Sequence, residues 1–212
     1  MPRPRVYDVD RLLDAAETLA VESGPAAVTV RALSDRTKVS NGAIYHTFGS
    51  RAGLLGQVWL RAAQRFLGAQ RDAVNAVLDA GSGRDRAIEA VVVAADAPAR
   101  FLLEHPTSGR FLLTVERDEL IGSADLPDEL AHDLQALDQS LVDLFVALSR
   151  ALWGRADRFT AEVIRDCVVE LPTALLLRGR RQPEPRVRER LATAVRAVLE
   201  LELELGPPSR TA

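Results

Sequence analysis

Side chains suited to reading DNA gather between residues 29 and 51, near the start of the chain. Asn41, Tyr45 and His46 carry groups that donate or accept hydrogen bonds, and Gly42 leaves room for close approach. Such groups can bind phosphates and the edges of bases in a groove. We therefore expect a DNA-binding surface here.

Apolar residues in the same stretch predict two short helices joined by a tight turn. Val30 and Leu33 give the first helix an inner face, and Ile44 and Phe48, four residues apart, give one to the second. Val39 fills the turn between them. The opposite face of the second helix is therefore free to meet DNA.

The residues around this pair predict how it is supported. Apolar residues from Val9 to Ala20 recur at helical spacing and predict a preceding helix that ends at residues 23–25, Ser-Gly-Pro. Thr29 is a predicted N-cap for the second helix, and Ser50 for the fourth. Lys38 lies in the turn at a position that favours glycine, because the turn requires a positive φ, so we expect a left-handed backbone there.

Over residues 8–60 the chain resembles the TetR family of transcriptional repressors. The run 39–48 is similar to that family's recognition helix, and Ser50-Arg51 to the start of its fourth helix, which anchors to backbone phosphate. Two departures from the pattern follow the turn: Thr47 stands where the family often has an aromatic residue, and Arg51-Ala52-Gly53 replaces the usual lysine followed by an acidic residue. The resemblance, together with the exposed face, assigns these DNA contacts: Thr29, Arg31, Ser40, Asn41, Gly42, Ala43, Tyr45, His46 and Arg51.

The charge is unevenly divided along the chain. Residues 1–51 hold seven Lys and Arg against six Asp and Glu, a net of +1, whereas residues 52–212 hold 20 against 24, a net of −4. Positive charge is expected where a protein meets phosphates. The acidic remainder predicts a body that faces away from DNA.

Helical periodicity continues through that body. An apolar face from residue 54 to 77 predicts a fourth helix of about 28 residues. Further helical segments are predicted at about residues 84–104, 107–121, 127–153, 160–177 and 185–204. Gly and Pro punctuate the breaks, and Pro172 should kink or end the helix that contains it.

These patterns predict an all-α protein of about nine helices, because no stretch alternates with a period of two. We expect a helix-turn-helix DNA-binding domain over residues 1–50. A helical domain for effector binding and dimerisation should occupy residues 51–206, and residues 207–212 should form a flexible tail.

Residues that could bind a metal or catalyse a reaction lack the required spacing. The three histidines lie far apart, and the single cysteine, Cys167, excludes an internal disulfide. Cys167 lies on an apolar stripe, so a small buried hydrophobe is favoured over a redox sensor. With no catalytic or nucleotide-binding motif, we expect neither enzyme activity nor a cofactor. With no membrane span or export signal, we expect a cytoplasmic protein.

The family resemblance also implies a largely apolar effector pocket among the body helices, suited to a small apolar or aromatic effector. Ordinary core packing is the alternative for each candidate. The candidate residues are Trp59, Phe101, His105, Arg110, Phe111 and Phe145.

The last two helices carry a wide apolar stripe, and the resemblance implies that they pair with their copies in a homodimer. A monomer that uses this face for its own core is the competing interpretation. The candidate interface residues are Val168, Leu175, Leu191, Val195 and Val198.

Together these features predict a homodimeric repressor that binds an inverted-repeat operator in double-stranded DNA and is released by a small molecule. The sequence does not distinguish a repressor from an activator. It also leaves open an all-α ligand-binding or enzymatic protein with a vestigial helix-turn-helix.

Overall fold

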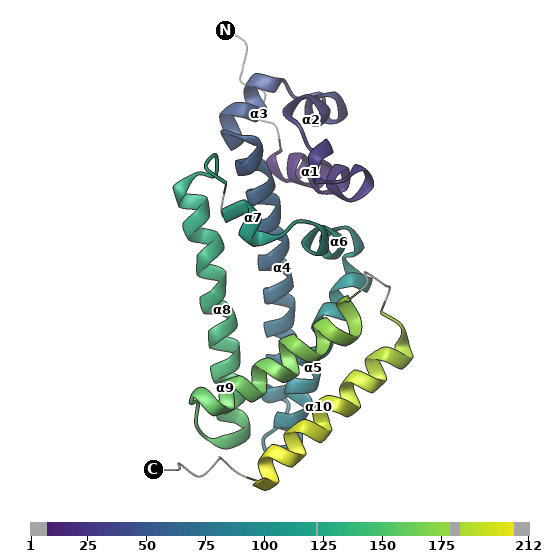
Figure 1. Ribbon diagram of the computed structural model, residues 1–212, viewed down its shortest axis with the longest axis vertical. Coiled ribbons are helices and arrows are strands. Elements are labelled where there is room, and N and C mark those ends of the chain that lie inside the picture. The colour runs from purple at the N-terminus through teal and green to yellow at the C-terminus, as the bar shows by residue number, and fades with distance from the viewer. Residues whose placement is uncertain (1–7, 122, 179–182, 206–212) are drawn as a thin grey trace. The chain divides into compact units, whose positions relative to one another are not determined.

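The computed structural model describes residues 8–121, 123–178 and 183–205, and these contain helices and no strand (Figure 1). The predicted all-α class is confirmed. These described ranges hold one α-helix more than the expected nine, because the 107–121 segment divides at Val115. The Val115 carbonyl accepts a hydrogen bond from Trp59 Nε1 at 3.0 Å. The predicted tail at 207–212 lies outside the described residues. The helices are α1 Val9–Ser23, α2 Val30–Thr37, α3 Asn41–Phe48, α4 Arg51–Asp79, α5 Arg84–Glu104, α6 Pro106–Thr114, α7 Arg117–Ile121, α8 Asp128–Trp153, α9 Arg158–Arg165 and α10 Pro185–Leu205.

The chain forms two compact units. Of the described residues, the first unit comprises 8–64 together with 107–137, and the second comprises 65–106 and 138–205. The continuous helix α4 therefore contributes its first half to one unit and its second half to the other. The predicted boundary at residue 50 separates a DNA-binding domain from the rest of the chain by function, whereas the two compact units are separated by packing. The functional boundary therefore stays a prediction.

The core of the first unit is built by α1 to α4 with α6. Leu33, Ile44 and Phe48, the predicted inner residues of α2 and α3, are all buried in it. They pack with Leu12 of α1 and Phe111 of α6 in one apolar cluster. Because full burial of such a side chain stabilises by about 1.5–3 kcal/mol, this cluster fixes the orientation of α3.

Hydroxyl caps define where α2 and α4 begin, as predicted. Thr29 Oγ1 accepts a hydrogen bond from Ala32 N at 3.1 Å, and Ser50 Oγ accepts one from Gly53 N at 2.8 Å. The turn from α3 into α4 is so tight that a Cβ on Gly53 would lie 2.1 Å from the Phe48 carbonyl oxygen. Any residue with a Cβ at position 53 would therefore have to displace the Phe48 carbonyl.

The core of the second unit forms between α5, the segment after α9, and α10. Leu191 and Val195 of α10 are buried in it. Two ion pairs hold α10 on α5: Arg188 binds Asp96 through two hydrogen bonds of 2.8 and 2.5 Å, and Arg196 binds Glu89. Fork-shaped pairing of this kind fixes direction as well as distance.

The helical backbone continues through Pro172, so of the predicted kink or end the end is wrong, and the kink stays a prediction. Pro172 keeps helical backbone angles, with φ −59° and ψ −42°. On either side the chain widens into π-helical segments, η2 Asp166–Glu170 and η3 Thr173–Leu177. The wider turns accommodate the missing N–H of the proline.

A second proline lies inside α5 and leaves a carbonyl without its helical partner. Pro98 has no N–H, so the Ala94 carbonyl lacks the hydrogen bond that residue 98 would otherwise donate. Gln70 of α4 replaces it, because its Nε2 donates to the Ala94 oxygen at 2.8 Å. The two helices are thereby fixed against each other at this position.

None of the helices in the described ranges is long and apolar enough to cross a membrane.

Replacing Gln70 by Met should lower the free energy of unfolding by about 1–3 kcal/mol, because the buried Ala94 carbonyl loses its donor. In a Pro98→Ala background, residue 98 regains an N–H for that carbonyl, so the same replacement should cost much less. Chemical denaturation of the four proteins measures the difference. Equal costs in both backgrounds would show that Gln70 does not serve the proline.

Candidate nucleic-acid interface

Helix α3 has one buried and one exposed face. Ile44 and Phe48 point into the core, and Ser40 caps the helix by accepting a hydrogen bond from Ala43 N at 3.3 Å. The structure brings together on the exposed face four of the predicted DNA contacts, and Tyr45 is 64% exposed. These four residues are Asn41, Gly42, Tyr45 and His46.

The turn before α3 has the predicted left-handed residue. Lys38 has φ 61° and ψ 20°, and its Nζ donates to the Asp35 carbonyl at 2.8 Å. The turn directs the start of α3 outward, where the N–H groups of Asn41 and Gly42 have no helical partner by position. Partial positive charge at such an end favours phosphate.

The start of α2 offers a second set of polar groups. Thr29 and Arg31 are both exposed there, as the predicted contacts require. Ala43, by contrast, is half-buried. The exposed side chains of this interface therefore come from the starts of α2 and α3 and from the outer face of α3.

Arg51 has a structural role that sequence reasoning missed. Its Nε donates to the Val28 carbonyl at 2.9 Å and its Nη2 to the Pro25 carbonyl at 2.5 Å. The guanidinium therefore fastens the connection between α1 and α2 to the start of α4. Its contact with phosphate stays a prediction.

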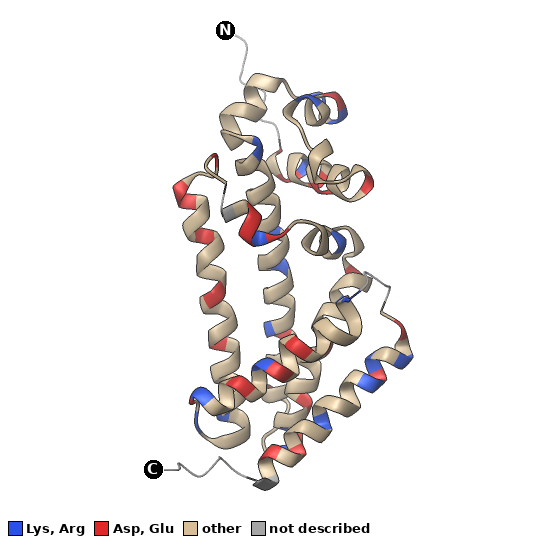
Figure 2. Ribbon diagram, in the orientation of Figure 1, with Lys and Arg blue, Asp and Glu red and all other residues tan. Residues whose placement is uncertain are grey.

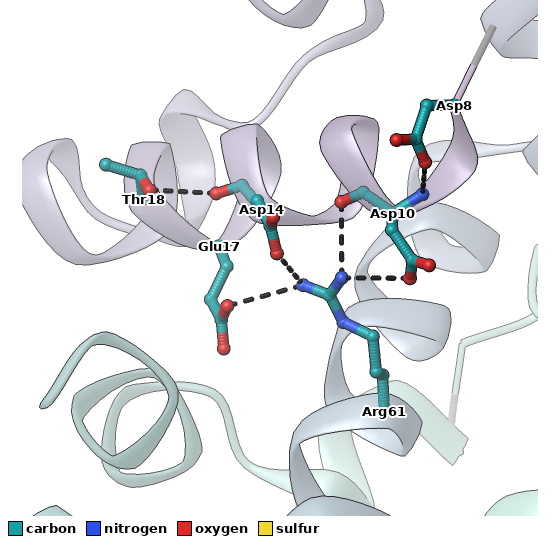
Figure 3. Close-up of polar contacts among 6 residues, drawn as sticks. All are labelled: Asp8, Asp10, Asp14, Glu17, Thr18 and Arg61. Carbon is teal, nitrogen blue, oxygen red and sulfur yellow. Dashed lines mark hydrogen bonds and ion pairs between the residues drawn. The ribbon is translucent and has the colours of Figure 1, made fainter. Parts of the chain in front are cut away.

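A second arginine, Arg61, fastens α1 to α4 (Figure 3). Its Nη1 donates to the carbonyl and carboxylate of Asp10, and its Nη2 lies 2.7 Å from Asp14 Oδ1 and 3.4 Å from Glu17 Oε2. Glu17 is only 4% exposed, so its charge requires this partner. The spacing of the three acids along one face of α1 was the available signal in the sequence.

The predicted effector residues are divided between the two units of the structure. Phe111 is fully buried in the core of the first unit, where Trp59 packs against the same cluster. Arg110 is exposed. In the second unit the rings of Phe101 and His105 lie with their centres 5.1 Å apart, while Phe145 packs on the core.

Three of the predicted interface residues also require correction. Val168, Leu191 and Val195 are buried in the core of their own chain, because α10 turns this stripe toward α5. They offer no surface to a partner. Leu175 is exposed and Val198 is half-buried, so both remain candidates.

Cys167 is buried, which confirms its interpretation as a small hydrophobe. Burial, with a smaller effect of the Asp166 carboxylate, raises the pKa of the thiol to about 12, so the thiolate is scarce at neutral pH. In the ranges that the structure describes, no three His, Cys, Asp or Glu side chains gather where they could hold a metal ion.

A family model described as bacterial regulatory proteins, tetR family, matches residues 12–58, the segment that carries α1 to α3 and the start of α4. Over these residues the chain is similar to the N-terminal segment of the TetR family. An HTH-type transcriptional repressor from Mycobacterium tuberculosis and an HTH-type transcriptional regulator from Mycobacterium bovis are each 38% identical over 58 residues. These residues are 27% of this chain, and they span about a third (31%) of the length of those relatives.

Solved structures extend the likeness in fold to nearly the whole chain. The TetR-family regulator PfmR from Thermus thermophilus is 24% identical with a TM-score of 0.64, covering 90% of this chain and 98% of its own. A transcriptional regulator from Pseudomonas aeruginosa reaches a TM-score of 0.71 at 17% identity, covering 94% and 93%. FadR from Bacillus subtilis, solved with stearoyl-CoA, has a TM-score of 0.60 at 15% identity, covering 92% and 98%.

Gly42 allows a test of how closely α3 approaches DNA. A Cβ at this position would meet nothing within 4 Å, so Gly42→Ala should raise the free energy of unfolding by up to about 1 kcal/mol. The added methyl should nevertheless weaken DNA binding if the helix lies against a groove. Denaturation and DNA titration measure the two effects.

Gly68→Ala is the matched control, because a Cβ there also meets nothing within 4 Å, and the position lies in the middle of α4. It should stabilise the protein without changing DNA affinity. Unchanged DNA affinity of Gly42→Ala as well would show that α3 does not approach DNA closely.

Proposed function

We propose that this protein is a homodimeric repressor of the TetR family that binds an inverted-repeat operator. The observation that carries the proposal is the outer face of α3, where Tyr45 and His46 are exposed while Ile44 and Phe48 hold the helix on the core. A helix supported in this way fits the major groove. Thr29 and Ser40, which cap the starts of α2 and α3, carry hydroxyl groups that can donate hydrogen bonds to phosphates.

A homodimer is supported by the outer side of α10. Val198 and Leu201 lie next to the stripe that faces the core, and Leu201 is exposed, as is Leu175 of η3. Figure 2 shows basic residues toward the start of α10 and acidic residues toward its end. Two copies of α10 that pair antiparallel about a two-fold axis would therefore oppose unlike charges.

Release by an effector is supported by the course of α4. This helix carries Arg51 and Arg61, which fasten the α1–α2 connection and α1, and it continues into the second unit. A hundredfold loss of DNA affinity requires a ligand to prefer one conformation by about 2.7 kcal/mol, which is within the range of ordinary coupling. The stearoyl-CoA complex of FadR supports an effector that is at least partly apolar.

DNA binding is tested by a mobility-shift titration with the DNA upstream of the gene for this protein. Tyr45→Ala and His46→Ala should each weaken specific binding about tenfold or more, because each removes a contact to base or phosphate. Their thermal unfolding should stay close to that of the unaltered protein. His132→Ala, exposed on α8, is the matched control and should bind normally.

Unaltered affinity of both α3 variants would remove the recognition helix from the proposal. Higher transcription with the protein bound than without it would assign an activator instead of a repressor.

The dimer is tested by sedimentation of a Val198→Glu, Leu201→Glu double variant. It should sediment as a monomer, because two carboxylates per chain would enter an apolar interface without partners. Leu103→Glu on α5, which is similarly exposed, should remain dimeric. A dimeric double variant would place the interface on another surface.

A further inference from the structure

A groove lies between α4 and α5 within the second unit. The groove is partly open to solvent, and its volume of about 30 Å³ is enough for one or two small groups rather than a whole effector. Apolar side chains form most of its wall, and Arg100 and Glu104 stand at the end of α5 beside it. The lining residues are Phe66, Ala69, Gln70, Ala73, Val93, Ala97, Arg100, Phe101 and Glu104.

Gln70, one of the lining residues, carries a buried polar atom that has no partner among the described residues. The side chain is 2% exposed, and its Oε1 accepts no hydrogen bond within the part of the chain that the structure describes. The orientation of the amide is fixed, because the Ala94 carbonyl can only accept and so must face the Nε2 group. A buried acceptor left unpaired is costly, so a donor that reaches it gains affinity.

The surroundings of Gln70 select the kind of donor. The rings of Phe66 and Phe101 meet edge to face with centres 5.5 Å apart and favour an apolar neighbour. Arg100 pairs with Glu104 at 3.3 Å, so the end of α5 near the groove presents both signs of charge. A cation would be repelled by Arg100, and an anion by Glu104 and by the Gln70 oxygen.

We propose that this groove is a binding subsite for a neutral hydroxyl or amide N–H group on an otherwise apolar ligand. The O–H or N–H group donates to Gln70 Oε1, and the adjoining apolar part lies against Phe66 and Phe101. Because Oε1 is shielded from solvent, the lining side chains shift slightly to admit the group. The identification of this ligand as the effector rests on the proposed function, whereas the subsite itself does not.

Pro98 is essential to the proposal. It frees the Ala94 carbonyl, which binds the amide nitrogen of Gln70 and so leaves the amide oxygen as the group offered to a ligand. A glutamine without this restraint could turn either end toward the groove.

Phenol and its methyl ether, anisole, test the subsite, because they share a ring and an oxygen and differ in the donor. Titrations of the full-length protein are followed through the NMR signals of the Gln70 side-chain amide and by binding curves. Phenol should bind about three- to tenfold more tightly than anisole, the worth of one hydrogen bond. It should also shift the Gln70 amide signals, whereas anisole should shift them less.

The role of Gln70 is isolated in the Pro98→Ala background, where residue 98 satisfies the Ala94 carbonyl and the stability of the helix pair no longer depends on Gln70. Pro98→Ala alone should weaken the preference for phenol without removing it, because Gln70 can then turn either end of its amide toward the groove, and addition of Gln70→Met should abolish it. Gln64→Met, the same change at an exposed position of α4, should leave the preference intact.

Equal binding of phenol and anisole to the unaltered protein, or a preference that survives Gln70→Met, would overturn the subsite. Operator binding is measured on the same proteins. Normal operator binding without a phenol preference rejects the subsite alone, and absent operator binding with a preserved preference rejects the proposed function alone.

Discussion

Burial of one face of α3 is the constraint on which the rest of the interface depends. A helix of eight residues is too short to be stable in water by itself. Ile44 and Phe48 supply the missing stability by entering the core of the first unit. The same burial turns Tyr45 and His46 outward, so the energy that forms the helix also determines which side chains can meet DNA.

Apolar packing sets the face of a helix, but it is less selective about its axial position and angle. In the first unit, polar contacts supply that selection. Arg51 binds the carbonyls of Pro25 and Val28, and Arg61 binds three acidic side chains of α1. Ser50 caps α4 and also donates to the Asp125 carbonyl at 2.7 Å. Each contact has directional geometry, so together they fix how α1 and α2 stand on the start of α4.

Local features of the sequence were sufficient for the elements of the interface. The caps at Thr29 and Ser50 and the left-handed Lys38 follow from short-range backbone chemistry, and the inner faces of α2 and α3 from periodicity. Their outcome depends on residues only a few positions away. For this reason the helix-turn-helix could be predicted closely, including its strained turn.

The errors concern residues whose surroundings are set by distant parts of the chain. The apolar stripe of α10 was predicted correctly, but periodicity does not say what covers it. Leu191 and Val195 face α5 of the same chain, not a second copy. Phe111 was similarly predicted to line a pocket, and it is buried in the apolar core of the first unit. In both cases the property visible in the sequence was hydrophobicity, and the missing information was the partner.

Gln70 shows the same limit for a polar residue. Pro98 in the sequence of α5 indicates that the Ala94 carbonyl lacks its helical hydrogen bond. Only the packing of α4 against α5 identifies Gln70 as the side chain that donates to this carbonyl. A buried glutamine is a specific choice for this place, because an apolar residue would leave the Ala94 oxygen unpaired and a carboxylate could not donate to it. The carbonyl thus fixes the position of α5 along α4. Since α4 continues from this contact to Arg61 and Arg51, any ligand that alters the contact acts on the helix to which the DNA-reading elements are fastened.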